Sequence, residues 1–101
     1  MITHLAMFRW NEGVTDEQVQ AFADALDGLV PQLATVKSFR HGSDVGSAEN
    51  AWDYGVVAEF DSIDDYRAYS SDPRHLEVAV TLGKPIAAQS SRVQIESQES
   101  T

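Results

Sequence analysis

The sequence predicts an α+β fold in which four antiparallel strands form one sheet with helices on one of its faces. Apolar residues follow strand-like patterns in four short segments, 2–10, 36–41, 52–60 and 90–96. Helical spacing occurs between the first and second of these segments, and again between the third and fourth. The predicted order is therefore β-α-β-β-α-β, and 101 residues leave room for only one such domain.

The first strand and the first helix are the most strongly patterned part of the chain. Segment 2–10 has apolar residues on both faces, which indicates that both faces are covered. After a turn at Asn11–Gly13, Thr15 and Gln18 form a capping box that begins a helix. The apolar residues of this helix recur at spacings of three and four: Val19, Phe22, Leu26, Leu29 and Leu33. We expect the helix to end near Val30, because a proline follows directly.

Two further strands occupy the middle of the chain. Val36–His41 predicts the second strand, and Trp52–Phe60 predicts the third. Between them, Gly42–Ser47 has the composition of a flexible polar loop. His41 stands next to this loop, so we expect it on the surface.

The segment 61–75 predicts a helix, a break and the start of another helix. Ser62 is a suitable N-cap for the first helix, while Asp72 and Pro73 are a suitable cap and first residue for the second. This arrangement places the phenol of Tyr69 and the imidazole of His75 on either side of a bend. Both groups can move protons, and the bend is therefore the candidate site.

The end of the chain completes the domain. Gly83–Pro85 stops the last helix, and Ser90–Glu96 predicts the fourth strand. Residues 97–101 contain no apolar residue, so we expect a frayed tail after a single domain at 1–96.

This order of elements is that of a ferredoxin-like protomer, a four-stranded antiparallel sheet with helices on one face. The opposite sheet face would then be bare, although it carries Leu5, Met7 and Val57. An apolar face of this kind usually marks an interface. We therefore expect a homodimer in which two open sheet faces stack on each other, which forms a dimeric α+β barrel.

Composition narrows the classes of function. The formal net charge of −9 disfavours nucleic acid and anionic membrane surfaces as partners. The chain has no cysteine, and its three histidines lack ligand spacing, so we expect no metal site. It has no apolar run of membrane-spanning length and begins directly with a strand. A cytoplasmic protein is therefore the expectation.

Several motifs together resemble the stress-responsive dimeric A/B barrel (Dabb) domain family. The segment Tyr69–His75, which reads Tyr-Ser-Ser-Asp-Pro-Arg-His, is similar to the family signature Tyr-x-x-His-Pro-x-His. The other matching features are His4 in the first strand, the helix start at Thr15, and Trp52-Asp53 before a strand that closes with Glu59-Phe60-Asp61-Ser62. The resemblance covers nearly the whole chain and implies the same homodimeric barrel.

The family includes plant polyketide cyclases, which close a poly-β-keto chain by an aldol reaction without a cofactor. The resemblance carries their functional tyrosine and histidine onto Tyr69 and His75, and their first-strand histidine onto His4. A third-strand histidine of their pocket aligns with Tyr54, and Asp72 replaces the first histidine of the signature. These two departures leave the plant substrate and its exact mechanism open.

The residues themselves support proton transfer at a carbonyl compound. A neutral His75 could remove a proton next to the carbonyl, while Tyr69 donates a hydrogen bond to the developing enolate. His4 and Tyr54 could orient the substrate in the same cavity. We expect the apolar walls of that cavity to come from Phe8, Val56, Phe22 and Leu26.

A structural explanation stands beside each functional one, because a strand histidine can simply pack and a tyrosine at helical spacing can belong to the core. Two classes of function therefore remain. The first is a cofactor-independent enzyme that acts on a hydrophobic carbonyl compound, as a cyclase or as a cofactor-free monooxygenase. The second is a non-catalytic stress-response or small-ligand-binding dimer.

Overall fold

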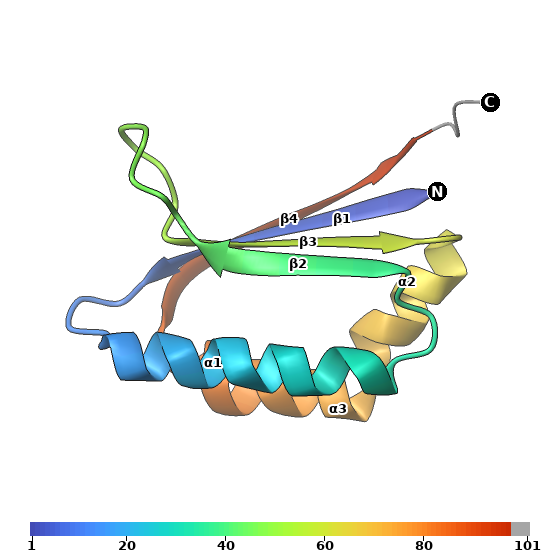
Figure 1. Ribbon diagram of the computed structural model, residues 1–101, viewed down its shortest axis with the longest axis horizontal. Coiled ribbons are helices and arrows are strands. Elements are labelled where there is room, and N and C mark those ends of the chain that lie inside the picture. The colour runs from blue at the N-terminus through green and yellow to red at the C-terminus, as the bar shows by residue number, and fades with distance from the viewer. Residues whose placement is uncertain (98–101) are drawn as a thin grey trace.

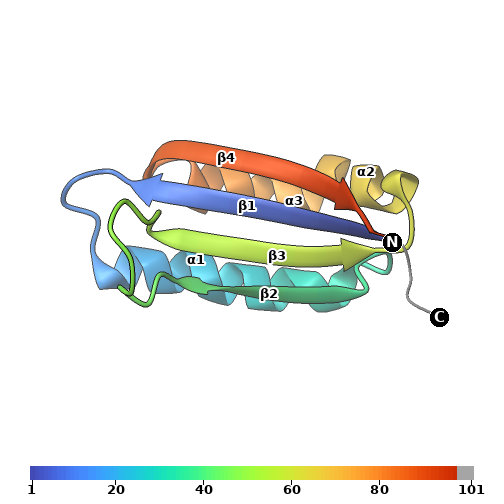
Figure 2. The same cartoon turned by 90° about the horizontal axis from the view of Figure 1, so that it is seen from above.

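A computed structural model describes residues 1–97 and shows the predicted ferredoxin-like architecture. The helices and strands in chain order are β1 (Ile2–Trp10), α1 (Asp16–Leu29), β2 (Ser38–Ser43), β3 (Tyr54–Phe60), α2 (Ile63–Ser71), α3 (Pro73–Val78) and β4 (Ala87–Glu96). The strands form one antiparallel sheet in the order β2-β3-β1-β4, with all helices below one face (Figure 1). Figure 2 shows β2 and β4 at the two edges of the sheet.

Two short segments extend the helices. A 3-10 turn, η1 (Val30–Gln32), follows α1 at the proline that was expected to end it. A π-helical turn, η2 (Ala79–Gly83), follows α3. A β-carbon at Gly83 would lie 3.2 Å from the ring of Phe22, so this glycine allows η2 to approach α1 closely.

The helix starts predicted from local sequence are present. The Thr15 hydroxyl accepts a hydrogen bond from the Gln18 N–H at 3.2 Å, and the Gln18 side chain accepts one from the Thr15 N–H at 2.9 Å. The Ser62 hydroxyl accepts from the Asp65 N–H, as an N-cap does. Helix α2, which leads into the bend, therefore begins where the sequence predicts.

The strand boundaries differ from the prediction by two or three residues. β2 is Ser38–Ser43, not Val36–His41, because it pairs with β3 through Gly42 and Ser43. β3 begins at Tyr54 and not at Trp52, since the Asp53 carboxylate instead accepts from the Trp10 N–H at 2.8 Å. β4 begins at Ala87, three residues early, because it pairs along the full length of β1.

The core lies between the sheet and the helices in two clusters. One surrounds Phe60, which is fully buried, and contains Ile2, Leu29, Leu33, Ala58 and Tyr69. The other contains Phe22, Leu26, Tyr54, Val56 and Ile86. The predicted apolar stripe of α1 thus divides between the two clusters.

The opposite face of the sheet is uncovered in the protomer, as predicted. Met7, Val93 and Ile95 are 43%, 51% and 48% exposed there. In the sheet register Leu5 lies between Val57 and Val93, so the exposed apolar side chains form one patch across β3, β1 and β4. We call this patch the open sheet face.

Candidate functional site

A cavity of about 100 Å³ lies between the sheet and the bend that joins α2 to α3. His4, Tyr69 and His75 all line it, so the structure brings the three predicted proton-transfer residues together. Phe8 and Val56, which were predicted as apolar walls, line it too. We call it the histidine cavity.

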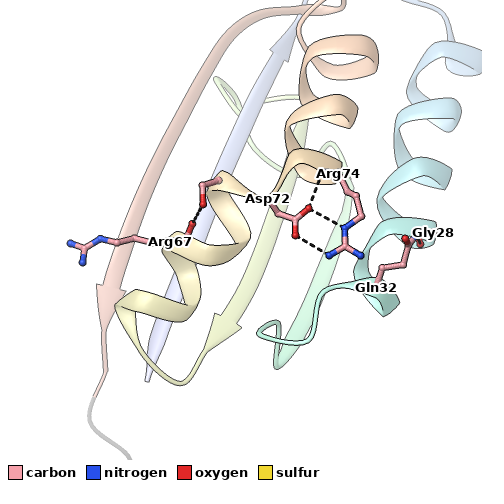
Figure 3. A network of polar contacts seen from close by, with 6 residues as sticks. Gly28, Gln32, Arg67, Asp72 and Arg74 are labelled. Atoms are coloured by element: carbon pink, nitrogen blue, oxygen red, sulfur yellow. Dashed lines mark hydrogen bonds and ion pairs between the residues drawn. The ribbon is translucent and has the colours of Figure 1, made fainter.

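The bend is held by the first residues of α3. The Asp72 carboxylate caps this helix by accepting from the Arg74 N–H at 2.8 Å, and it also accepts from the Arg74 guanidinium at 3.0 and 2.9 Å (Figure 3). These hydrogen bonds lower the pKa of Asp72 to about 2. The cap sets the direction of α3 and so places the His75 ring against Tyr69, with ring centroids 4.3 Å apart.

His75 is arranged as a neutral proton acceptor. Its Nδ1–H donates to the Ser70 carbonyl at 3.3 Å, which leaves Nε2 as the basic nitrogen. Burial lowers the pKa of His75, and the positive charge of Arg92 adds to this, while the Ser70 carbonyl and Asp72 oppose it. Burial is therefore the principal cause of the lowered pKa of His75.

Tyr69 is arranged as a hydrogen-bond donor. Burial raises its pKa to about 12, so the phenol keeps its proton at neutral pH. Within the described residues, every fully buried side-chain oxygen or nitrogen has a hydrogen-bond partner. The Tyr69 hydroxyl forms no hydrogen bond with these residues, so it cannot be fully buried. The hydroxyl therefore keeps accessible surface, and since Tyr69 lines the histidine cavity it can donate to a molecule there.

His4 is a buried, neutral histidine on the sheet side of the cavity. Its Nδ1 accepts from the Gln94 side-chain amide at 2.8 Å, so Nε2 carries the proton. Its ring lies 4.9 Å from that of Tyr66 and 6.0 Å from that of Tyr69. Burial is the main cause that lowers the pKa of His4 to about 4, and the charge of Arg92, with that of His75 when protonated, contributes to the lowering.

Arg92 lines the cavity as well, although sequence reasoning did not single it out. It faces Ala6 in the sheet register, two residues from the pair of His4 and Gln94. One signal in the sequence marks it, because the three alternate positions 90, 92 and 94 of β4 are polar (Ser90, Arg92, Gln94) where the alternation calls for core residues. Polar side chains at inward strand positions indicate a cavity and not a filled core.

The remaining predicted lining residues lie elsewhere. Tyr54, Phe22 and Leu26 pack together in the second core cluster and do not line the histidine cavity. The Tyr54 hydroxyl is 2.6 Å from Nδ1 of His41, whose Nε2 is 2.7 Å from the Asp27 carboxylate. The expectation that His41 lies on the surface is wrong, because its side chain is 9% exposed and joins α1, β2 and β3.

The lowered pKa of His4 predicts a pH-dependent stability. His4 titrates near 6.5 when unfolded and about 4 when folded, so the unfolded chain takes up its proton first as pH falls. Its contribution is present above pH 6.5 and is lost toward pH 4. We expect the free energy of unfolding to fall by about 2–3 kcal/mol between about pH 7.5 and 4.5 from this residue. Urea unfolding of wild type and His4→Gln at both pH values measures it, and equal losses in the two proteins would contradict it.

The fold and the cavity together define a ferredoxin-like α+β protein with two histidines and a tyrosine between its sheet and its helices. The chain belongs to the Stress responsive A/B Barrel Domain family (Dabb), whose model matches residues 2–98. It is 31% identical to a stress-response A/B barrel domain-containing protein of Arabidopsis thaliana, across 89% of this chain and 90% of that one. The predicted family is thus confirmed, and the likeness to plant polyketide cyclases stays a prediction.

Solved structures show the same fold. A dimeric ferredoxin-like protein of unknown function from Thermobifida fusca is 36% identical, with a TM-score of 0.86 over 93% of this chain and 88% of that chain. A hydroxynitrile lyase from Passiflora edulis is 16% identical, with a TM-score of 0.83 over 99% of this chain and 95% of that chain. At this level of identity the second likeness shows the fold alone.

Two kinds of feature are missing from the described residues. Within residues 1–97, no three histidine, aspartate or glutamate side chains gather closely enough to hold a metal ion. Over the same residues, no helix is both long and apolar enough to span a membrane.

Proposed function

We propose that this protein is a cofactor-independent enzyme that moves a proton next to the carbonyl of a hydrophobic small molecule, as an aldol-type cyclase or a related lyase does. The arrangement of His75 carries the proposal. Its Nδ1–H is held by the Ser70 carbonyl, its pKa is lowered, and its ring lies against Tyr69 at a cavity. A base that stays neutral at pH 7 is what abstraction of such a proton needs.

The proposed step uses three side chains. The carbon–hydrogen bond next to the carbonyl breaks, its proton moves to Nε2 of His75, and its electron pair moves onto the carbonyl oxygen as an enolate. The Tyr69 hydroxyl donates a hydrogen bond to that oxygen, and the positive charge of Arg92 stabilises it. The enolate carbon can then attack a second carbonyl or take back a proton.

The test is proton exchange in D₂O, followed by NMR. Hydrophobic ketones and diketones, aromatic and polyketide-like, are incubated with the protein, and deuterium incorporation next to the carbonyl is measured. Saturable acceleration above a matched concentration of free imidazole supports the proposal. A second candidate is a non-catalytic stress-response or small-ligand-binding dimer, because the histidine cavity alone, at about 100 Å³, is smaller than the roughly 300 Å³ at which small-molecule sites usually begin. Binding of the same compounds without acceleration would establish that candidate instead.

The proposal includes a homodimer joined through the open sheet face. Its support is the exposed apolar patch around Val93, together with the dimeric state of the ferredoxin-like protein from Thermobifida fusca. A charge placed in such an interface would lack a partner. We expect Val93→Glu to raise the dissociation constant of the dimer by roughly 100-fold or more, which sedimentation velocity measures.

The matched control for this prediction is Val80→Glu. Val80 is 60% exposed but lies on η2, on the helical side of the sheet, so the dimer should be unaffected. Equal dissociation constants for wild type and Val93→Glu would mean that the open sheet face is not the interface.

A further inference from the structure

A second, larger cavity adjoins the histidine cavity. It has a volume of about 330 Å³ and lies between η2 and β4, where Val80, Gly83 and Ala87 supply apolar wall. The two cavities share four lining residues: Phe8, Ala79, Ser90 and Arg92. A molecule can therefore place a small head at His75 and a larger body in the second cavity.

Within the part of the chain that the structure describes, some lysine and arginine side chains have an ion-pair or hydrogen-bond partner, and others have none. Of the seven lysines and arginines, three form ion pairs with carboxylates: Lys37, Arg67 and Arg74. The Arg9 side chain bonds to Gln89 and lies over the Trp52 ring. The side chains of Arg40, Lys84 and Arg92 form no ion pair or hydrogen bond among residues 1–97.

Two of these three unpaired cations, Lys84 and Arg92, line the same cavity. Within the described residues, no aspartate or glutamate lines either cavity. The protein carries a net charge of −9, so carboxylates are abundant elsewhere on it. Two cations left without partners in an acidic protein create a local positive potential, and this potential would attract an anionic group.

We propose that the joined cavities bind an amphiphilic carboxylate, with its apolar body against Phe8 and Val80 and its carboxylate on Arg92 and Lys84. This inference rests on the proposed function and deepens it, because Arg92 also lines the histidine cavity. The substrate is then a hydrophobic oxo acid, whose carbonyl reaches His75 while its carboxylate pairs with Arg92. Bidentate pairing with a carboxylate suits a guanidinium.

The experiment compares three probes of equal chain length, octanoate, octan-1-ol and octylamine, by titration calorimetry at low and high salt. We expect octanoate to bind wild type at least about tenfold more tightly than octan-1-ol, and octylamine most weakly. High salt should reduce the preference for octanoate. Arg92→Gln should abolish that preference, Lys84→Gln should reduce it, and Arg92→Lys should retain part of it.

Arg40→Gln is the matched control. The Arg40 side chain is also unpaired within residues 1–97 and is exposed, but it lies on β2 and lines neither cavity. Arg40→Gln changes the net charge by the same amount as Arg92→Gln. Because Arg40 lines neither cavity, the octanoate preference should persist in this variant. Equal affinities for octanoate and octan-1-ol in wild type, no binding of either, or the same loss in Arg40→Gln as in Arg92→Gln would each overturn the inference.

Proton exchange measured on the same protein samples separates this inference from the proposed function. Octanoate binding that depends on Arg92, without any exchange that depends on His75, would retain the anion site and reject the catalytic role. Exchange that depends on His75, with no preference for octanoate, would retain the catalytic role and reject the anion site.

Discussion

Replacing His75 with glutamine is expected to lower the rate of proton exchange next to a bound carbonyl by roughly 10²- to 10⁴-fold, the usual contribution of a general base. Glutamine keeps a polar side chain of similar reach, but its amide cannot accept a proton at neutral pH. The variant should bind the carbonyl compound with little change, because Phe8, Val56 and Arg92 still line the cavities. Deuterium incorporation and calorimetry on the same samples measure the two effects separately.

The control is His41→Gln, which removes a histidine that lies outside both cavities. Its exchange rate should match that of wild type once thermal melting shows that the variant is folded. The wild-type rate should also fall with decreasing pH, because His75 must be neutral to act and its pKa lies below the ordinary value of 6.5. An exchange rate that survives in His75→Gln would remove His75 from the mechanism.

Replacing Phe60 with alanine is expected to destabilise the protein by about 3–5 kcal/mol, the range for removing a large aromatic side chain from a core. Phe60 is completely buried on β3. Its ring lies 5.3 Å from that of Tyr69 and 5.6 Å from that of Tyr66. A domain of this size has a total stability of about 5–15 kcal/mol, so the loss is a large fraction of it. Urea unfolding followed by tryptophan fluorescence measures the change.

Two other variants make the test of Phe60 specific. Phe60→Leu retains much of the buried volume and should lose clearly less stability than Phe60→Ala. Val45→Ala, at a side chain that is 88% exposed in the loop between β2 and β3, should change stability by less than about 0.5 kcal/mol. A loss below about 1 kcal/mol in Phe60→Ala would show that this part of the core is not tightly packed around Tyr69.

The order of elements follows from signals that act over three or four residues. Each helix start is marked by a capping residue that forms its own hydrogen bond to the helix. These caps are present at Thr15, Ser62 and Asp72. The strand ends were predicted less accurately, because hydrogen bonding to the neighbouring strand decides where a strand begins and ends. β4 extends back to Ala87 since β1 offers a partner there, which nothing in segment 87–90 indicates by itself.

Part of the proposed site could likewise be predicted from local sequence, and part of it depends on strand pairing. The nearness of Tyr69 and His75 was predictable, because the cap at Asp72 and the proline that follows it set the bend between them. The family signature covers the same segment. The positions of Arg92 and Gln94 beside His4 depend on pairing between β1 and β4, about 90 residues apart. No local pattern encodes that register.

The sequence by itself determined the fold class, the family, the open sheet face and the bend that brings Tyr69 and His75 together, since periodicity, caps and turns are local properties of a chain. Only the tertiary structure decided which side chains share a cavity. It placed Tyr54 against His41, away from the histidine cavity, and it left Arg92 unpaired beside that cavity within residues 1–97. Burial and distant charges set the pKa values of His4 and His75, and both arise only when the sheet and the helices pack together.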